Sequence, residues 1–330
     1  MTELSTEEKM EDIFSEESVK RAAQARNIGA ELSRLNDVRG DVAVLVADMG
    51  VVAGEFRQRH PTHFFDLGIA ETNTMSVAAG LAAEGLIPFT MLMSCFGMLK
   101  CAEQIRTDVA SNHLPVRIVA RGTGLALGFF GTSHHTVEDI AIARSITNMT
   151  VVAPSDFNAF LSLVESTIDL PGPVYFRMSS GAEDASVYDS VPVIERGRFM
   201  TVRPGSDVTV IAIGNGVVAA LGAAEVLAGE GVSVEVIDAA YLKPVDEQAI
   251  LRAAEHTGRI LTVEEHNVIG GLGTIVAEVL GRHRAPSLLK IFGLPDEDLA
   301  VSWPAVLIEH YGLTVTGVLE QLRQLLAEEK

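Results

Sequence analysis

The sequence predicts an α/β protein built from two doubly wound domains. Apolar runs of strand length alternate with helical segments along the chain, which is the order of a mostly parallel sheet covered on both faces. The 330 residues, of which 48% are hydrophobic, suffice for two cores of ordinary size. The alternation stops at residues 181–196, where Asp, Glu, Ser and Pro collect, so we expect a linker there.

The first domain is expected at residues 18–180. Its first strand is DVAVLVAD at residues 41–48, a continuous apolar run between turn signals that is typical of a buried parallel strand. Its most apolar helix is expected at residues 71–83, because Gly85 and Pro88 stop the helical pattern. Further strands are predicted at 62–66, 87–93, 116–121, 150–153 and 174–176, and further helices at 18–35, 96–112, 136–146 and 156–167.

The second, smaller α/β domain is expected at residues 197–330. Strands are predicted at 208–213, 233–238, 259–264 and 288–292, and helices at 217–228, 246–257, 274–280 and from about residue 314. Residues 1–17 form an acidic leader, which is expected either to be frayed or to begin a helix.

The composition argues against several classes of partner. A net charge of −19 opposes binding to nucleic acid and to anionic membranes. The apolar runs are too short to span a bilayer, and residues 1–17 lack the order of a signal peptide, so we expect a cytoplasmic protein. Cys95 and Cys101 have no His or Cys at ligand spacing nearby, so they indicate buried thiols and no metal site.

One stretch, GIAETNTMSVAAG at residues 68–80, places a carboxylate in the first turn of an Ala-rich helix. Glu71 has two interpretations. The helix dipole favours an acid at this position in any protein. Alternatively, Glu71 is a buried acid whose apolar surroundings raise its pKa until the carboxyl can share a proton with a ligand.

The segment FDLGIAETN at residues 65–73 resembles the pyrimidine-binding domain of the transketolase family of thiamine diphosphate enzymes. The resemblance implies that Glu71 hydrogen-bonds the cofactor's aminopyrimidine nitrogen and favours the tautomer that removes the thiazolium proton. The segments ILTVEEH at 260–266 and GGLG at 270–273 are similar to the C-terminal domain of transketolases and of 2-oxoacid dehydrogenase β subunits, where this domain chiefly packs the dimer. The resemblance covers roughly residues 42–325.

The resemblance implies three further cofactor contacts. Asp48 would lie near the thiazolium, with a polar cap of a strand end as the alternative. Ile69 would pack against the aminopyrimidine, and Phe96 would stack on it as a flat apolar ring, with core packing as the alternative for Phe96. The family's other aromatic positions are Met93 and Lys100 here, so the aromatic clamp is only partly kept.

The segment RGTGLALGFFGTSHH at residues 121–135 implies substrate contacts. His134 corresponds to the family's substrate-side histidine, and His135 replaces a common Gln. A neutral imidazole can pass a proton near pH 7, so we assign both histidines to the substrate, with surface polarity as the alternative.

The same region departs from pentose-phosphate transketolases. Gly122 replaces a His, residues 129–130 are Phe-Phe instead of Glu-Asp, and Ser180 replaces a phosphate-binding Arg. Arg121 and Arg177 are the nearby candidates for an anionic group of the substrate. The donor or acceptor is therefore expected to differ from the standard pentose phosphate pair.

The chain contains no Gly-Asp-Gly motif, through which the family binds Mg²⁺ and the cofactor's diphosphate in an N-terminal domain. It thus resembles only the C-terminal half of a transketolase. The implied partner is a separate diphosphate-binding subunit that supplies the Mg²⁺ ligands. Thiamine diphosphate would be held between the subunits, with two copies of each chain in a heterotetramer.

The implied function is that of the pyrimidine-binding subunit of a split transketolase, a transferase of carbohydrate metabolism. With its partner, it would move a two-carbon ketol unit from a ketose to an aldose, the substrates being sugars or sugar phosphates. The alternatives are a 2-oxoacid dehydrogenase β subunit or deoxyxylulose phosphate synthase-like enzyme, and a catalytically silent scaffold. Glu71 argues against the scaffold, because a dead pocket has no reason to hold a buried acid.

Overall fold

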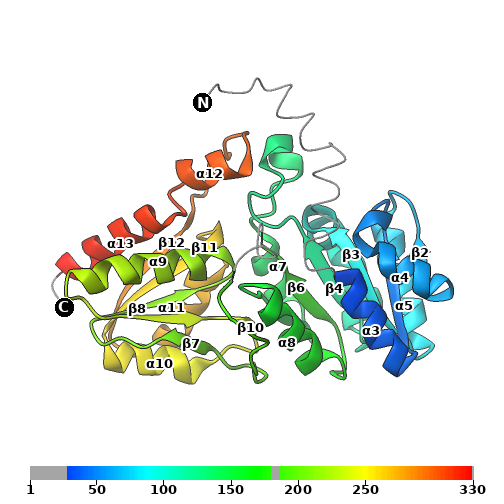
Figure 1. The fold of residues 1–330 in the computed structure, drawn as a ribbon, viewed down its shortest axis with the longest axis horizontal. Coiled ribbons are helices and arrows are strands. Elements are labelled where there is room, and N and C mark those ends of the chain that lie inside the picture. Colours follow the sequence, from blue (N-terminus) through cyan, green and yellow to red (C-terminus); the bar gives the residue numbers. More distant parts are fainter. Residues whose placement is uncertain (1–27, 180–185, 329–330) are drawn as a thin grey trace.

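Two mostly parallel β-sheets, each lying between layers of helices, form the protein (Figure 1). The computed structural model describes residues 28–179 and 186–328. The predicted leader, residues 18–27 of the first predicted helix, and Ser180 lie outside the described residues. The predicted α/β class with two parallel-dominated sheets is confirmed.

The first sheet has seven strands in the order β10-β5-β6-β4-β3-β1-β2, and all neighbours are parallel except β10 and β5. The strands are β1 (Val42–Val46), β2 (Phe64–Asp66), β3 (Ile87–Met93), β4 (Arg117–Arg121), β5 (Thr150–Val152), β6 (Val174–Arg177) and β10 (Tyr241–Lys243). The α-helices that accompany them are α3 (Ile28–Arg39), α4 (Gly54–Arg59), α5 (Glu71–Ala83), α6 (Ala102–Gln104), α7 (Asp139–Ser145) and α8 (Phe157–Thr167).

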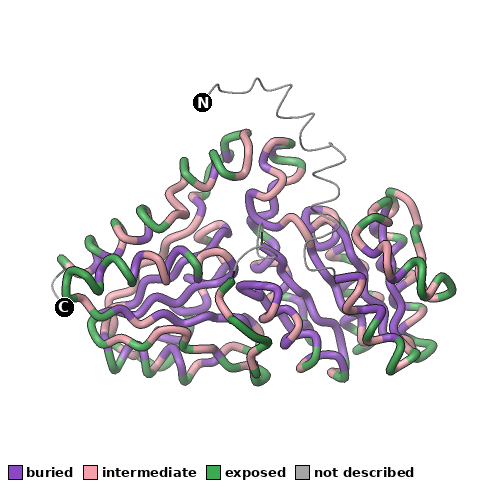
Figure 2. The backbone as a smooth tube through the Cα atoms, viewed as in Figure 1, coloured by how far each residue is buried: buried purple, intermediate pink, exposed green. Residues whose placement is uncertain are grey.

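Strand β1 is apolar throughout because its side chains are buried on both faces of the sheet. Val42, Val44 and Val46 point into the cluster formed with α3, α4 and α8. Ala43 and Leu45 point the opposite way, into the cluster formed with α5 and α7. All five residues are fully buried, as expected for a central parallel strand. Figure 2 shows buried backbone running through the middle of both halves of the molecule.

The second sheet has five strands in the order β12-β11-β8-β9-β7, and only β7 runs antiparallel to its neighbour. Its strands are β7 (Met200–Arg203), β8 (Val208–Ala212), β9 (Val234–Asp238), β11 (Arg259–Asn267) and β12 (Leu288–Leu294). The helices of this half are α9 (Asn215–Gly229), α10 (Glu247–His256), α11 (Leu272–His283), α12 (Pro304–His310) and α13 (Val315–Ala327).

The two sheets are joined by more than the connecting chain. Strand β10 follows β9 in sequence, but it pairs with β5 of the first sheet through Tyr241–Val152 and Lys243–Val151. One apolar cluster also runs from α5 and α7 to α10 and α11 without a break. The two halves therefore share a sheet edge and a core.

Several elements differ from the predictions. The helix predicted at 96–112 contains two π-helical segments, η3 (Cys95–Lys100) and η4 (Ile105–Ala110), on either side of α6. The helix predicted at 136–146 begins only at Asp139, because residues 134–136 belong to the preceding loop. The sequence patterns also missed the short α-helices α4 and α12 and the short strands β7 and β10.

None of the helices in the described ranges combines the length and the apolar character that crossing a membrane requires.

A buried acid lies where the two halves meet. Asp238 ends β9 with no exposed surface, and its Oδ2 accepts hydrogen bonds from Ser155 Oγ at 2.6 Å and Tyr188 Oη at 2.9 Å. Burial raises the pKa of Asp238 to about 7, although both hydroxyl donors act against this rise. The folded protein therefore favours the protonated acid.

Replacing Asp238 by Asn should flatten the pH dependence of stability. The folded pKa of about 7 lies above the ordinary 3.8, so this acid contributes stability at low pH that is lost as the pH rises through 7. Asn keeps an acceptor oxygen without a charge to desolvate. Asp238→Asn should match the wild type near pH 4 and exceed its free energy of unfolding by about 2 to 4 kcal/mol near pH 8. Urea unfolding across this range tests the prediction, and a difference that does not change with pH would contradict it.

Candidate active site

A cavity of about 220 Å³ opens at the carboxyl ends of the strands of the first sheet. Its lining residues are Ala47, Asp48, Met49, Ile69, Glu71, Met93, Phe96 and His134. Five of these were predicted as site residues, and they come from the segments after β1, β2, β3 and β4. Ligands of parallel α/β sheets bind at this edge. Three larger hollows, of about 350, 490 and 640 Å³, are lined by none of the predicted site residues.

The backbone that carries Asp48 and Ile69 is fixed by a neighbouring acid. Asp66 Oδ1 accepts hydrogen bonds from Asp48 N at 3.0 Å and from Gly68 N at 3.1 Å. Asp48 itself has φ +54°, a left-handed conformation that is uncommon for a residue other than glycine and is often found at functional sites. Asp66 therefore ties the turns after β1 and β2 together at the cavity.

Glu71 begins α5 and is only 5% exposed. Its Oε2 accepts a hydrogen bond from Lys100 Nζ at 2.8 Å, and the lysine side chain is half exposed. Burial raises the pKa of Glu71, but the Lys100 hydrogen bond, the backbone N–H of Glu71 and the Lys100 charge together bring it below its usual value. The predicted upward shift is therefore wrong for this chain, because the prediction did not include Lys100.

Aromatic side chains enclose the histidine of the cavity. His134 makes an edge contact with Phe96, at 5.2 Å between ring centroids, and a tilted contact with Phe130 at 4.5 Å. Its Nδ1 lies 2.8 Å from Ser133 Oγ. Lys100 Nζ lies 5.8 Å from the Phe96 centroid, so the same cation faces the carboxylate of Glu71 and the ring of Phe96.

Three predicted residues lie outside the cavity lining. His135 is buried, its Nε2 has no hydrogen-bond partner among the described residues, and burial lowers the pKa of its imidazole. Arg121 is half-buried at the end of β4.

Arg177 has no exposed surface, and it donates to Asp139 Oδ2 at 2.9 Å and to the Glu265 carbonyl at 2.8 Å. The structure therefore corrects its predicted role as a substrate contact, because the guanidinium is enclosed in an ion pair.

Sequence reasoning missed Asp66 and the role of Lys100. The order Asp66-Leu67-Gly68 could have predicted the role of Asp66, because Asp side chains commonly accept a hydrogen bond from the backbone N–H two residues on. In the sequence, Lys100 stands out only as a departure from an aromatic position of the family. Within residues 28–179 and 186–328, no group of three or more His, Cys, Asp or Glu side chains is arranged to hold a metal ion.

Comparisons with known proteins find two family matches along the chain. Residues 21–183 match the family described as transketolase, pyrimidine binding domain. Residues 197–318 match the family described as transketolase, C-terminal domain.

Curated relatives fall into two groups by length. One of the subunits of the apulose-4-phosphate transketolase of Phocaeicola vulgatus is 35% identical over 92% of this chain and 93% of the relative. A 6-deoxy-6-sulfo-D-fructose transketolase subunit from Clostridium sp. (strain MSTE9) is 36% identical over 84% of this chain and 86% of the relative. By contrast, the chain spans only 46% of the 1-deoxy-D-xylulose-5-phosphate synthase of Desulforudis audaxviator, at 35% identity.

Among solved structures, a split gene transketolase described as an inactive beta4 tetramer superimposes with a TM-score of 0.85 at 35% identity. The match covers 94% of this chain and 99% of that one. The predicted resemblance is confirmed, and the chain belongs to the transketolase family, with a pyrimidine-binding domain followed by a transketolase C-terminal domain.

Proposed function

We propose that this chain is the pyrimidine-binding subunit of a split, thiamine diphosphate-dependent transketolase. The observation that carries the proposal is the convergence of Asp48, Ile69, Glu71, Phe96 and His134 on one cavity. Two relatives of nearly the same length are named as subunits of transketolases, which favours a subunit over half of a longer synthase. We retain residues 18–180 and 197–330 as the two domains, with the linker at 181–196.

The cavity suits one flat heteroaromatic ring. Its volume of about 220 Å³ is below the roughly 300–1,000 Å³ of a typical small-molecule pocket, so it fits a ring better than a whole diphosphate cofactor. Phe96 and Ile69 offer apolar surfaces to such a ring, and Glu71 offers a carboxylate. When bound, thiamine diphosphate would supply the electron sink for the two-carbon transfer.

Glu71 would hold the proton shared with the ring nitrogen at its Oε2. Lys100 competes for that oxygen in the present arrangement and keeps the carboxyl ionised. The lysine side chain is half exposed, so its ammonium group can move away from Glu71 Oε2 into water. We therefore assign Glu71 to proton sharing and Lys100 to control of its charge.

His134 would face the substrate. Phe96 and Phe130 fix the plane of its ring, and with Nδ1 engaged by Ser133, Nε2 is the nitrogen left to exchange a proton with a sugar hydroxyl or carbonyl. Asp48 would lie on the thiazolium side of the cavity. Arg121 stays a proposed contact for an anionic group of the substrate.

The partner subunit is assigned the diphosphate and its magnesium ion, because the sequence lacks the Gly-Asp-Gly motif of the family. We propose two copies of each chain in the cytoplasm. The substrates would be a ketose and an aldose other than the standard pentose phosphates. Apulose 4-phosphate and 6-deoxy-6-sulfofructose, from the names of the relatives, are the first compounds to test.

The direct test is titration of thiamine diphosphate and Mg²⁺ into this chain, a purified diphosphate-binding subunit, and their complex. Binding by the complex alone supports the split site, and two-carbon transfer between sugars then tests the activity. Cofactor binding by this chain alone would contradict the assignment of the metal ligands to the partner. Formation of 1-deoxy-D-xylulose 5-phosphate instead would favour the synthase alternative.

Glu71→Gln should lower the turnover of the assembled enzyme at least about 100-fold, because the amide cannot share a proton with the ring nitrogen. Assembly with the partner should be unchanged, since Gln has nearly the same shape. The measurement is kcat with both subunits present, alongside size-exclusion chromatography. Glu84→Gln, an exposed acid just after the same helix, is the matched control. Full activity of Glu71→Gln would refute the assigned role.

Lys100→Met should raise the pKa of Glu71, because burial then acts without the opposing hydrogen bond and charge. Carboxyl ¹³C chemical shifts followed against pH measure this pKa, and the missing signal in Glu71→Gln identifies the resonance. Lys290→Met serves as the control, since Lys290 contacts Gln324 in the C-terminal domain. An unchanged titration midpoint in Lys100→Met would show that the ion pair does not set the charge of Glu71.

A further inference from the structure

The segment that brings His134 to the cavity is a loop closed at its base. Gly124 and Thr136 form an antiparallel bridge, with N–H···O distances of 2.8 and 3.1 Å in the two directions. Ser94 Oγ donates to the Gly122 carbonyl at 3.0 Å. We call residues 122–136 the site loop.

The end of β11, which belongs to the second sheet, holds both sides of this loop. The Glu265 carboxylate accepts a hydrogen bond from Leu125 N at 2.7 Å, 140 residues away in sequence. Two residues later, Asn267 N donates at 2.9 Å to the carbonyl of Val137, the residue that directly follows the loop. One strand thus holds the loop near its beginning and just after its end.

The fit between the loop and the carboxylate is close. Gly124 has φ +64°, and a Cβ placed on it would collide with Glu265 Oε1. No side chain can occupy that space while the carboxylate is there. The glycine therefore permits Glu265 to approach the loop backbone.

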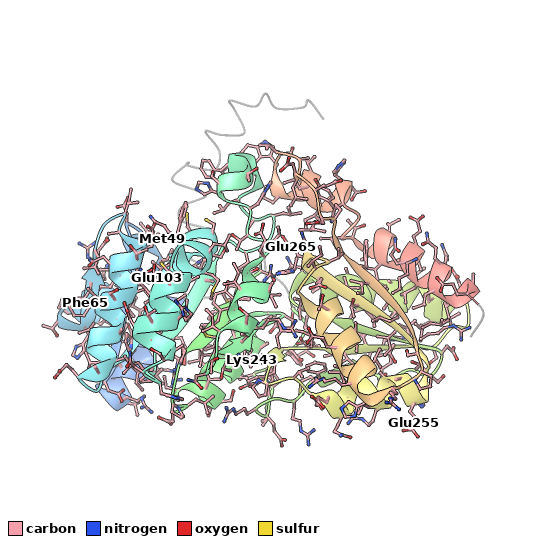
Figure 3. The ribbon with its side chains drawn as sticks, turned by 180° about the vertical axis from the view of Figure 1, so that it is seen from behind. Met49, Phe65, Glu103, Lys243, Glu255 and Glu265 are labelled. Atoms are coloured by element: carbon pink, nitrogen blue, oxygen red, sulfur yellow. The ribbon has the colours of Figure 1, made fainter. Side chains whose placement is uncertain are left out.

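Glu265 is itself held in position. It is only 5% exposed, and Arg177 donates to its carbonyl while pairing with Asp139 at the start of α7. Figure 3 places Glu265 between the two sheets, below the site loop and α12.

The outer part of the loop rests on the C-terminal half as well. Phe129 packs on Trp303 with 5.0 Å between ring centroids. Leu125 lies in an apolar cluster with Leu294 and Leu307. The C-terminal half therefore supports the loop at its base and at its outer end.

We propose that Glu265 is a positioning residue for the active site: through the Leu125 N–H it fixes the site loop and so sets the position of His134 in the cavity. The effect on catalysis rests on the proposed function, whereas the effect on the loop does not. The C-terminal domain would then shape the substrate side of the site in addition to packing the assembly.

The neighbouring acid provides a matched control. Glu264 is buried beside Glu265 in the same strand, but its carboxylate accepts hydrogen bonds from Leu272 N at 2.6 Å and Gly273 N at 2.8 Å, at the start of α11. Changes at Glu264 should loosen α11, and changes at Glu265 should loosen the site loop.

Hydrogen exchange of the full chain, alone and with its partner, tests whether Glu265 holds the site loop. Glu265→Ala should speed exchange at Leu125 at least about tenfold, because its acceptor is lost. Glu265→Gln retains an acceptor oxygen and should restore protection, and Glu264→Gln should leave the loop unchanged. Gly124→Ala, which alters the contact from the loop side, should act as Glu265→Ala does. Unchanged exchange in Glu265→Ala, or equal loosening of the loop by Glu264→Gln, would overturn the proposal.

Two further readouts separate positioning from general stability. Trp303 is the only tryptophan in the chain, so its quenching by acrylamide reports contact with the loop, and quenching should rise in Glu265→Ala. In the active pair, Glu265→Ala should lower kcat about 10- to 100-fold with a smaller change in KM, and Glu265→Gln should recover most of it. Wild-type kcat in Glu265→Ala would overturn the positioning role. An inactive wild-type pair would instead refute the proposed function. Hydrogen exchange would still show whether Glu265 holds the site loop.

Discussion

Arg177 and Asp139 form an ion pair with no exposed surface where the two halves of the molecule meet. Removing two such charges from water costs several kcal/mol each, so the pair persists only where further hydrogen bonds compensate. Here Tyr175 Oη donates to Asp139 and the guanidinium also donates to the Glu265 carbonyl. Displacing Arg177 or Asp139 would leave the other charge buried and unpaired, which holds β6 and α7 together. The hydrogen bond from Arg177 to the Glu265 carbonyl ties β11 to the same pair.

The cavity depends on this fixed frame on one side and on the first sheet on the other. The turns after β1 and β2, tied by Asp66, present Asp48 and Ile69, while α5 presents Glu71. His134 comes from a loop whose base is hydrogen-bonded to the second sheet. A small cavity is thus assembled from both halves, although all of its lining residues belong to the first.

Local patterns allowed much of this to be predicted. The strand at 41–48 and the helix at 71–83 were recognisable because their signals, an apolar run and stop residues, lie within or directly beside the elements themselves. The short strand β10 was not recognisable, since a strand of three residues forms through its pairing with β5 and carries no clear pattern in its own sequence. The charge state of Glu71 was mispredicted for the same reason, because Lys100 is 29 residues away and meets it only in the folded chain.

Strand β10 belongs to the first sheet although it follows β9 of the second sheet in sequence, so a cut between the two halves also divides the first sheet. If the halves were separated within residues 186–196, the N-terminal piece would lose β10, and β5 would become an edge with unpaired backbone N–H and C=O groups. Bare edges of this kind recruit strands from other molecules and lead to aggregation. Proteolytic nicking in the connecting segment should leave two fragments that stay associated, because the β5–β10 pairing and the shared apolar cluster hold them together.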